Sequence, residues 1–197
     1  MNYSIKEEIV NELVINKSRF IGVLKKIKTE KEVAIVLKAL KNQYKEATHY
    51  CYAYIIDNTK RFHDDNEPSG TAGLPILEVL TKNNLNYLLC VVIRYFGGVK
   101  LGTGGLIRAY TKTTSEALKL AKIVPLIKGQ VIKIKFDYPD IKVVDYILKE
   151  SQITEKIFKA DITYIIKVSS EAWPDIKRRL QHIKNLTIKE LEKGFIT

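Results

Sequence analysis

The glycines of this sequence are concentrated in one short stretch, and that concentration restricts the fold more than any other feature. Seven of the ten glycines lie between Gly70 and Gly105. Glycine costs backbone entropy, so a cluster is useful only where the chain needs a positive φ angle or a close approach of its backbone. The stretch therefore predicts tight loops, and the neighbouring segments must fit around them.

The later glycines lie between a predicted strand and a predicted helix. The apolar run from Leu88 to Tyr95 predicts a central strand, and a helical pattern begins near Gly104. This order directs backbone N–H groups and the positive end of a helix towards an anion. A turn that only lets the helix pack on the strand is the alternative. We favour a site that binds an anion or nucleic acid, with the following candidates: Arg94, Gly97, Gly98, Lys100, Gly102, Gly104, Gly105 and Arg108.

An acidic loop precedes the first of these glycines. Asp64, Asp65 and Glu67 are close enough in sequence to bind a divalent ion or to supply a general base. Alternatively, acidic residues before a helix stabilise the helix dipole and have no catalytic or metal-binding role. The loop leads into a short predicted helix, for which Thr71 is a candidate N-cap. The anion-site hypothesis includes the residues at this helix entry: Ser69, Gly70 and Thr71.

A strand predicted for residues 48–57 carries His49 and Cys51 on one face, two residues apart. A zinc site needs more ligands, and the sequence has no Cys-x-x-Cys pair. A buried, reduced cysteine beside a hydrogen-bonded histidine is the simpler interpretation, although His49 can still line the site. Metal binding stays open and no cofactor is expected, so the catalytic candidates are the following four: Asp64, Asp65, Glu67 and His49.

The net charge of +11 and the sequence pI near 9.5 favour a polyanionic partner, nucleic acid before an anionic membrane surface. The alternative is that the proteome is rich in lysine, which makes many proteins basic whatever their function. Apolar runs such as Leu85 to Ile93 are too short to cross a bilayer, so no membrane is expected. Both cysteines lie in apolar segments, which suits reduced thiols and a cytoplasmic protein.

Two predicted helices carry basic stripes at helical spacing. One stripe taken alone is more typical of a solvated face. Two stripes together suggest that one side of the first domain meets phosphate groups. The stripes consist of Lys31, Lys38, Lys41 and Lys45 on the earlier helix, and of Arg108, Lys112, Lys119 and Lys122 on the later one.

Pro125 marks a predicted boundary between a first domain, residues 1–125, and a second domain, residues 126–197. The second part alternates strands and helices in the order β-α-β-β-α-β, which is typical of a ferredoxin-like domain. It lacks glycine loops, clustered carboxylates and nucleophile motifs, so we expect it to have a binding or packing role and no catalytic role. The fold class predicted for the whole chain is α+β.

The two motif regions resemble the signature of the YigZ/IMPACT family. The match consists of Asp-Asp-x-Glu-Pro-Ser-Gly-Thr-Ala-Gly from Asp64 and Arg-Tyr-Phe-Gly-Gly-x-Lys-Leu-Gly-x-Gly-Gly-Leu-x-Arg-Ala-Tyr from Arg94. Asn66 stands where the family usually has glycine, Ile93 where it has threonine, and Tyr50 where it often has a second histidine. The last change weakens a metal or acid–base role beside His49.

The resemblance implies a first domain similar to domain IV of elongation factor G and to a ribosomal-protein domain. It also implies a second domain similar to domain V of that factor. Eukaryotic relatives regulate translation through a different N-terminal domain without a counterpart in these 197 residues, so we do not expect that specific role.

Three functional hypotheses follow from the sequence. The first is a non-enzymatic protein that associates with RNA or the ribosome and regulates translation. The alternative is an enzyme or small-ligand binder that acts on a phosphorylated substrate with a metal or base at the acidic loop. A scaffold that binds a protein partner through the motif surface is the third. The sequence lacks a Walker lysine motif and the common hydrolase motifs, which favours the first.

Overall fold

The structure is a computed structural model, and it describes residues 2–196. The chain forms two compact units, Met1–Pro125 and Leu126–Thr197. Both units combine helices with antiparallel strands, as an α+β chain does. No helix within the described residues is long and apolar enough to cross a membrane.

A five-stranded antiparallel sheet forms the centre of the first unit, with the strand order β2-β3-β6-β4-β5. The central strand predicted from the apolar run is confirmed, because β6 lies in the middle of the sheet and seven of its eight residues are buried. The strands span Ile9–Ile15 (β2), Ser18–Lys26 (β3), His49–Ile56 (β4), Thr59–His63 (β5) and Leu88–Tyr95 (β6).

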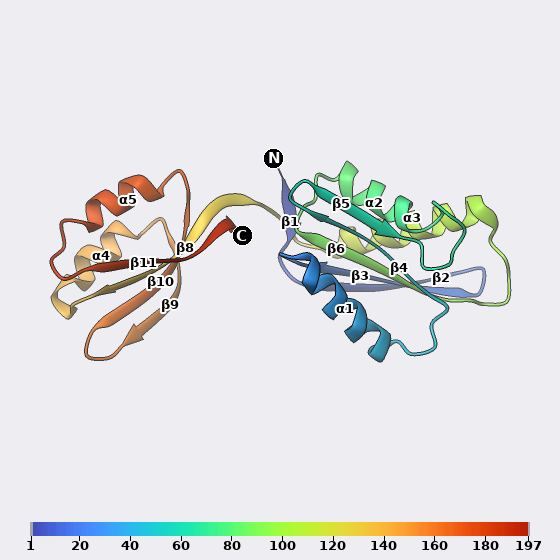
Figure 1. Ribbon diagram of the computed structural model, residues 1–197, viewed down its shortest axis with the longest axis horizontal. Coiled ribbons are helices and arrows are strands. Elements are labelled where there is room, and N and C mark those ends of the chain that lie inside the picture. Colours follow the sequence, from blue (N-terminus) through green and yellow to red (C-terminus); the bar gives the residue numbers. More distant parts are fainter. Residues whose placement is uncertain (1, 197) are drawn as a thin grey trace. The chain divides into compact units, whose positions relative to one another are not determined.

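Helices cover both faces of this sheet, as Figure 1 shows. The alternation of side chains in β3 sends Phe20 and Leu24 towards α2 and α3, and Ile21 and Val23 towards α1. The prediction that the two basic stripes share one side of the domain is therefore wrong, because α1 and α3 lie on opposite faces. The helices span Glu30–Gln43 (α1), Gly73–Lys82 (α2) and Gly102–Leu120 (α3).

Two strand pairings were absent from the sequence-based expectation. Residues 59–63, predicted as the first part of a loop from Asn58 to Gly70, form the edge strand β5, which pairs with β4. In addition, β1 (Tyr3–Ile5) pairs with β7 (Ile123–Pro125) and brings the two ends of the first unit together. Strand β5 places His63 at the edge of the sheet, so the acidic residues that follow it begin beside β4.

The second unit has the predicted β-α-β-β-α-β order, and its antiparallel sheet has the strand order β11-β8-β10-β9. Both helices contribute to one core, since Ile147 of α4 and Ile176 of α5 pack with Ile132, Ile134 and Phe136 of β8. The elements are β8 (Ile127–Phe136), a 3-10 turn (Tyr138–Asp140), α4 (Ile141–Ile147), β9 (Gln152–Phe158), β10 (Ile162–Ser169), α5 (Trp173–Leu180) and β11 (Thr187–Ile196).

Candidate functional site

The two motif regions meet at a single carboxylate oxygen in the first unit. Oε1 of Glu67, in the segment between β5 and α2, accepts a hydrogen bond from Nη1 of Arg94 at 2.7 Å. The same oxygen accepts a hydrogen bond from the hydroxyl of Tyr110 at 2.8 Å. Arg94 comes from β6 and Tyr110 from α3, so one acidic side chain joins the strand, the helix and the loop. Their side chains are buried, with 4% of the Glu67 side chain and 5% of the Arg94 side chain exposed.

Strand β4 adds two further side chains to this group. Nε2 of His49 lies 3.8 Å from Oε1 of Glu67. Nδ1 of His49 lies 2.8 Å from the carbonyl oxygen of Asp65, and it must carry the proton because a carbonyl only accepts. Sγ of Cys51 lies 2.9 Å from the Asp64 carbonyl oxygen and 3.3 Å from the Tyr110 hydroxyl. We call the five residues the Glu67 cluster: His49, Cys51, Glu67, Arg94 and Tyr110.

The guanidinium group of Arg94 is fixed from several sides. Its Cζ atom lies 5.4 Å from the ring centroid of Phe20 and 5.5 Å from that of Phe96. Its Nη2 lies 3.4 Å from the hydroxyl of Ser18, which also accepts a hydrogen bond from the amide of Gly97 at 3.2 Å. Arg94 was predicted to contact an external anion, but here its charge faces an internal carboxylate.

The other two acids of the loop also bond inwards. The carboxylate of Asp64 accepts backbone hydrogen bonds from Gly70 at 2.9 Å, Ala72 at 3.1 Å and Gly73 at 2.8 Å. The carboxylate of Asp65 accepts one from the amide of Tyr50 at 2.7 Å. Asp64 thus binds the amides at the start of α2, where the sequence suggested an external anion. Within residues 2–196, no three or more His, Cys, Asp or Glu side chains are grouped so that they could hold a metal ion.

Thr71 does not act as the predicted N-cap. Ala72 occupies that position, and the hydroxyl of Thr71 donates instead to the carbonyl oxygen of Pro68 at 2.7 Å. Gly70 has a φ of +73°, which suits glycine, whereas the neighbouring Ser69 is exposed. Of the three residues at this helix entry, Ser69 is the one whose side chain lies on the surface.

The glycines of the second motif serve two different purposes. A Cβ atom on Gly97 would lie 2.0 Å from the carbonyl oxygen of Lys17, so this glycine lets β6 approach the β2–β3 turn. In contrast, Gly98 and Gly102 have φ values of +82° and +68° and open space around them. Gly104 and Gly105 lie in the first turn of α3. The packing interpretation therefore applies to Gly97, while the other four lie in the loop or the helix start.

The remaining predicted cations lie on the surface at the start of α3. Lys100 and Arg108 are both exposed, as is Lys112 one turn beyond Arg108. The first turn of α3 has no acidic residue, and no side chain among residues 2–196 caps it. The first amides of a helix carry partial positive charge and lack partners within the helix. We call Lys100, Arg108 and Lys112, with these amides, the α3 basic surface.

Sequence reasoning omitted three residues of this arrangement from the site: Ser18, Cys51 and Tyr110. Tyr110 was identifiable, because its position on the inner face of a helix buries a phenol that needs a hydrogen-bond partner. Ser18 contacts Arg94 across 76 positions of sequence, and no local pattern indicates such a pairing.

The thiols are expected to be inert in the folded protein. Burial raises the pKa of Cys51 and raises that of Cys90 to about 12. The thiolate is the reactive form, so both cysteines should react with iodoacetamide far more slowly in the native protein than in urea at the same pH. Intact mass measured over time checks this. Rapid labelling of native Cys51 would contradict the closed geometry of the Glu67 cluster.

Comparison with known proteins identifies sequences and a solved structure that are similar to this chain. The Impact N-terminal domain family matches residues 16–118. IMPACT family member YvyE of Bacillus subtilis (strain 168) is 42% identical over 178 residues, covering 89% of this chain and 80% of that protein. An IMPACT family member of Haemophilus influenzae is 34% identical over 173 residues, covering 84% of each. The crystal structure of a hypothetical protein shares the fold, with a TM-score of 0.67, 23% identity and coverage of 96% of this chain and 97% of that one.

Proposed function

Because this chain belongs to the IMPACT family, we propose that it is a non-enzymatic cytoplasmic protein that associates with RNA or the ribosome and regulates translation. The unit Met1–Pro125 is the signature domain in this proposal, similar to domain IV of elongation factor G. The unit Leu126–Thr197 is the ferredoxin-like domain, similar to domain V of that factor.

The separation of charge within the signature motifs carries this proposal. The acids Asp64, Asp65 and Glu67 all accept hydrogen bonds from within the unit. The cations Lys100 and Arg108 lie exposed beside the uncapped start of α3. A motif that directs its negative charges inwards and its positive charges outwards suits a phosphate backbone, because phosphate contacts come from lysine, arginine and helix N-termini.

The same contacts argue against the enzymatic alternative. A metal or general base at the acidic loop needs a carboxylate that is available to a substrate. Three backbone amides surround the Asp64 carboxylate, and Glu67 already neutralises Arg94. His49 has an oriented imidazole and a carboxylate 3.8 Å away, but only 15% of its side chain is exposed.

The proposal predicts RNA binding that depends on the α3 basic surface. The double variant Lys100→Ala/Arg108→Ala should bind a single-stranded oligoribonucleotide about tenfold more weakly than wild type. It should also show a shallower dependence of affinity on salt, by roughly 1.4 in the log–log slope, because two fewer phosphates release counterions. Fluorescence anisotropy with a labelled oligonucleotide over a series of salt concentrations measures both quantities.

The matched control removes the same charge from the opposite face of the sheet. Lys31 and Lys38 are exposed residues of α1, and the variant Lys31→Ala/Lys38→Ala should bind RNA nearly as well as wild type. Equal losses in both double variants would show that only net charge matters. Undetectable or salt-independent binding by wild type would overturn the proposed function itself.

A further inference from the structure

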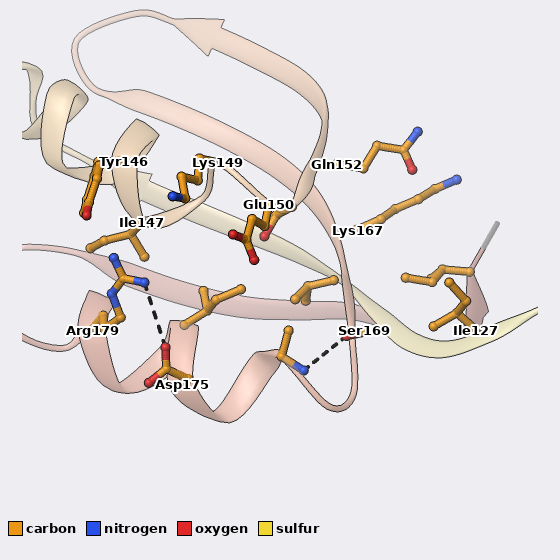
Figure 2. A pocket seen from close by; sticks show the side chains of 15 residues that line it. Ile127, Tyr146, Ile147, Lys149, Glu150, Gln152, Lys167, Ser169, Asp175 and Arg179 are labelled. Carbon is orange, nitrogen blue, oxygen red and sulfur yellow. Dashed lines mark hydrogen bonds and ion pairs between the residues drawn. The ribbon is translucent and has the colours of Figure 1, made fainter.

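The second unit contains a cavity of about 590 Å³ that the signature motifs do not reach. It lies where α5 faces the segment between α4 and β9, as Figure 2 shows. Lys149 and Glu150 come from that segment, while Asp175 and Arg179 come from α5 on the other side. Sites for small ligands typically measure roughly 300–1,000 Å³, so the cavity is large enough for one drug-sized or nucleotide-sized group.

The floor of the cavity is apolar. Ile147, Val168 and Ile176 line it, and all three are buried parts of the core of this unit. Ile127 and Ile196 extend this apolar surface from β8 and β11. A ligand that fills the cavity therefore needs a flat or compact apolar part, and a free inorganic anion would leave this floor uncovered.

The rim of the cavity is basic and carries an exposed aromatic ring. Three cations line it from three different segments: Lys149, Lys167 and Arg179. Tyr146 is 65% exposed, and both Nζ of Lys149 and Cζ of Arg179 lie 5.7 Å from the centroid of its ring. Exposed tyrosine and arginine planes are the groups on which unpaired bases stack.

Acidic and amide groups complete the lining. Asp175 already bonds Arg178 at 2.5 Å and lies 3.9 Å from Arg179, so it holds the arginines in place. Glu150 and Gln152 are exposed at the cavity and can accept hydrogen bonds from amino groups on the edge of a base. A polyphosphate would meet the Glu150 carboxylate unfavourably, whereas a base with one neighbouring phosphate would not.

From this geometry we infer that the cavity binds one unpaired nucleotide of an RNA chain, with the base over the apolar floor and its phosphate against the basic rim. The inference rests on the proposed RNA-binding function and assigns a second contact to the unit Leu126–Thr197. That unit has 14 Lys and Arg residues against 10 Asp and Glu residues, so its net charge also favours an RNA partner.

A variant that fills the cavity tests the inference. Ala172 lines the cavity and is exposed, so Ala172→Phe blocks the cavity without disturbing the core. It should weaken binding of a short single-stranded oligoribonucleotide by about tenfold, because the base would no longer fit in the cavity and the loss of one base contact has that magnitude. The matched control is Ala160→Phe, at an exposed position in the β9–β10 turn outside the cavity, which should bind like wild type.

A charge variant provides an independent measurement. Lys149→Ala should weaken binding severalfold and flatten its salt dependence, whereas Lys142→Ala, an exposed α4 lysine outside the cavity, should change neither. The ligands are then compared directly. The single-stranded oligoribonucleotide should bind more tightly than AMP and more tightly than an RNA duplex of the same length.

The outcomes separate this inference from the proposed function. If wild type binds RNA and Lys100→Ala/Arg108→Ala weakens it, but Ala172→Phe binds like wild type, the inference is wrong and the proposed function stands. Binding of AMP without binding of the oligoribonucleotide would overturn both and leave a free nucleotide as the ligand. Equal binding of duplex and single strand would overturn the inference alone.

Discussion

Replacing Glu67 with alanine is expected to lower the free energy of unfolding of the first unit by about 3–5 kcal/mol, since removing one partner of a buried ion pair leaves the other charge uncompensated. Arg94 would lose its 2.7 Å contact and Tyr110 its 2.8 Å acceptor. The double variant Glu67→Ala/Arg94→Met should be less destabilised than the sum of its single changes, because the second change removes the orphaned charge.

Urea unfolding can separate the two units, because the sole tryptophan, Trp173, lies in the second unit against its core. The Trp173 fluorescence transition, which reports the second unit, should be unchanged in Glu67→Ala. Circular dichroism also reports the first unit, and that part of its transition should move to lower urea concentration. Glu116→Ala, which removes an exposed ion pair with Lys119, is the control and should cost no more than about 1 kcal/mol. A Glu67→Ala effect as small as this control would refute the structural role of the Glu67 cluster.

Asp64→Ala is expected to cost about 3 kcal/mol and to release the start of α2. Hydrogen bonds to a charged group contribute about 1.5–3 kcal/mol each, and three of them share this carboxylate, so their contributions are not additive. Asp64→Asn should lie between wild type and Asp64→Ala, because its amide retains one oxygen acceptor.

Hydrogen exchange of individual amides measures this effect directly. The amides of Gly70, Ala72 and Gly73 should be protected in wild type and exchange quickly in Asp64→Ala. Glu78→Ala, an exposed position in the same helix, should leave their exchange unchanged. Unchanged protection in Asp64→Ala would mean that these amides are held by something other than the carboxylate.

These two predictions give the signature a structural meaning. The acidic residues close the loop between β5 and α2 and connect it to β6 and α3. The exposed side of the same motif is basic, at Lys100 and Arg108. A variant in an acidic position should therefore act on stability, whereas a variant in an exposed basic position should act on binding. The two classes are distinguishable by measuring unfolding and RNA affinity on the same samples.

The sequence by itself determined the family, the α+β class, the central strand and the element order of the second unit. Each depends on local information. The run Leu88–Ile93 is apolar over its whole length because its strand is covered on both faces. The edge strand β5 escaped detection because it is mostly polar and exposed, with Lys60 and Arg61 in the middle and Phe62 as its one apolar residue, so no alternation of apolar side chains indicates it.

Only the tertiary structure decided which motif residues face inwards. The contact between Glu67 and Arg94 joins residues 27 positions apart, and its strength depends on the burial that the whole unit creates. Likewise, position 97 requires glycine because the backbone of Lys17, in the β2–β3 turn, leaves no room for a Cβ atom. The pattern of side chains along a helix or strand reports its own exposed and buried faces, but not which distant element covers them. For this reason the two basic helices looked like one surface in sequence and lie on opposite faces of the sheet in the fold.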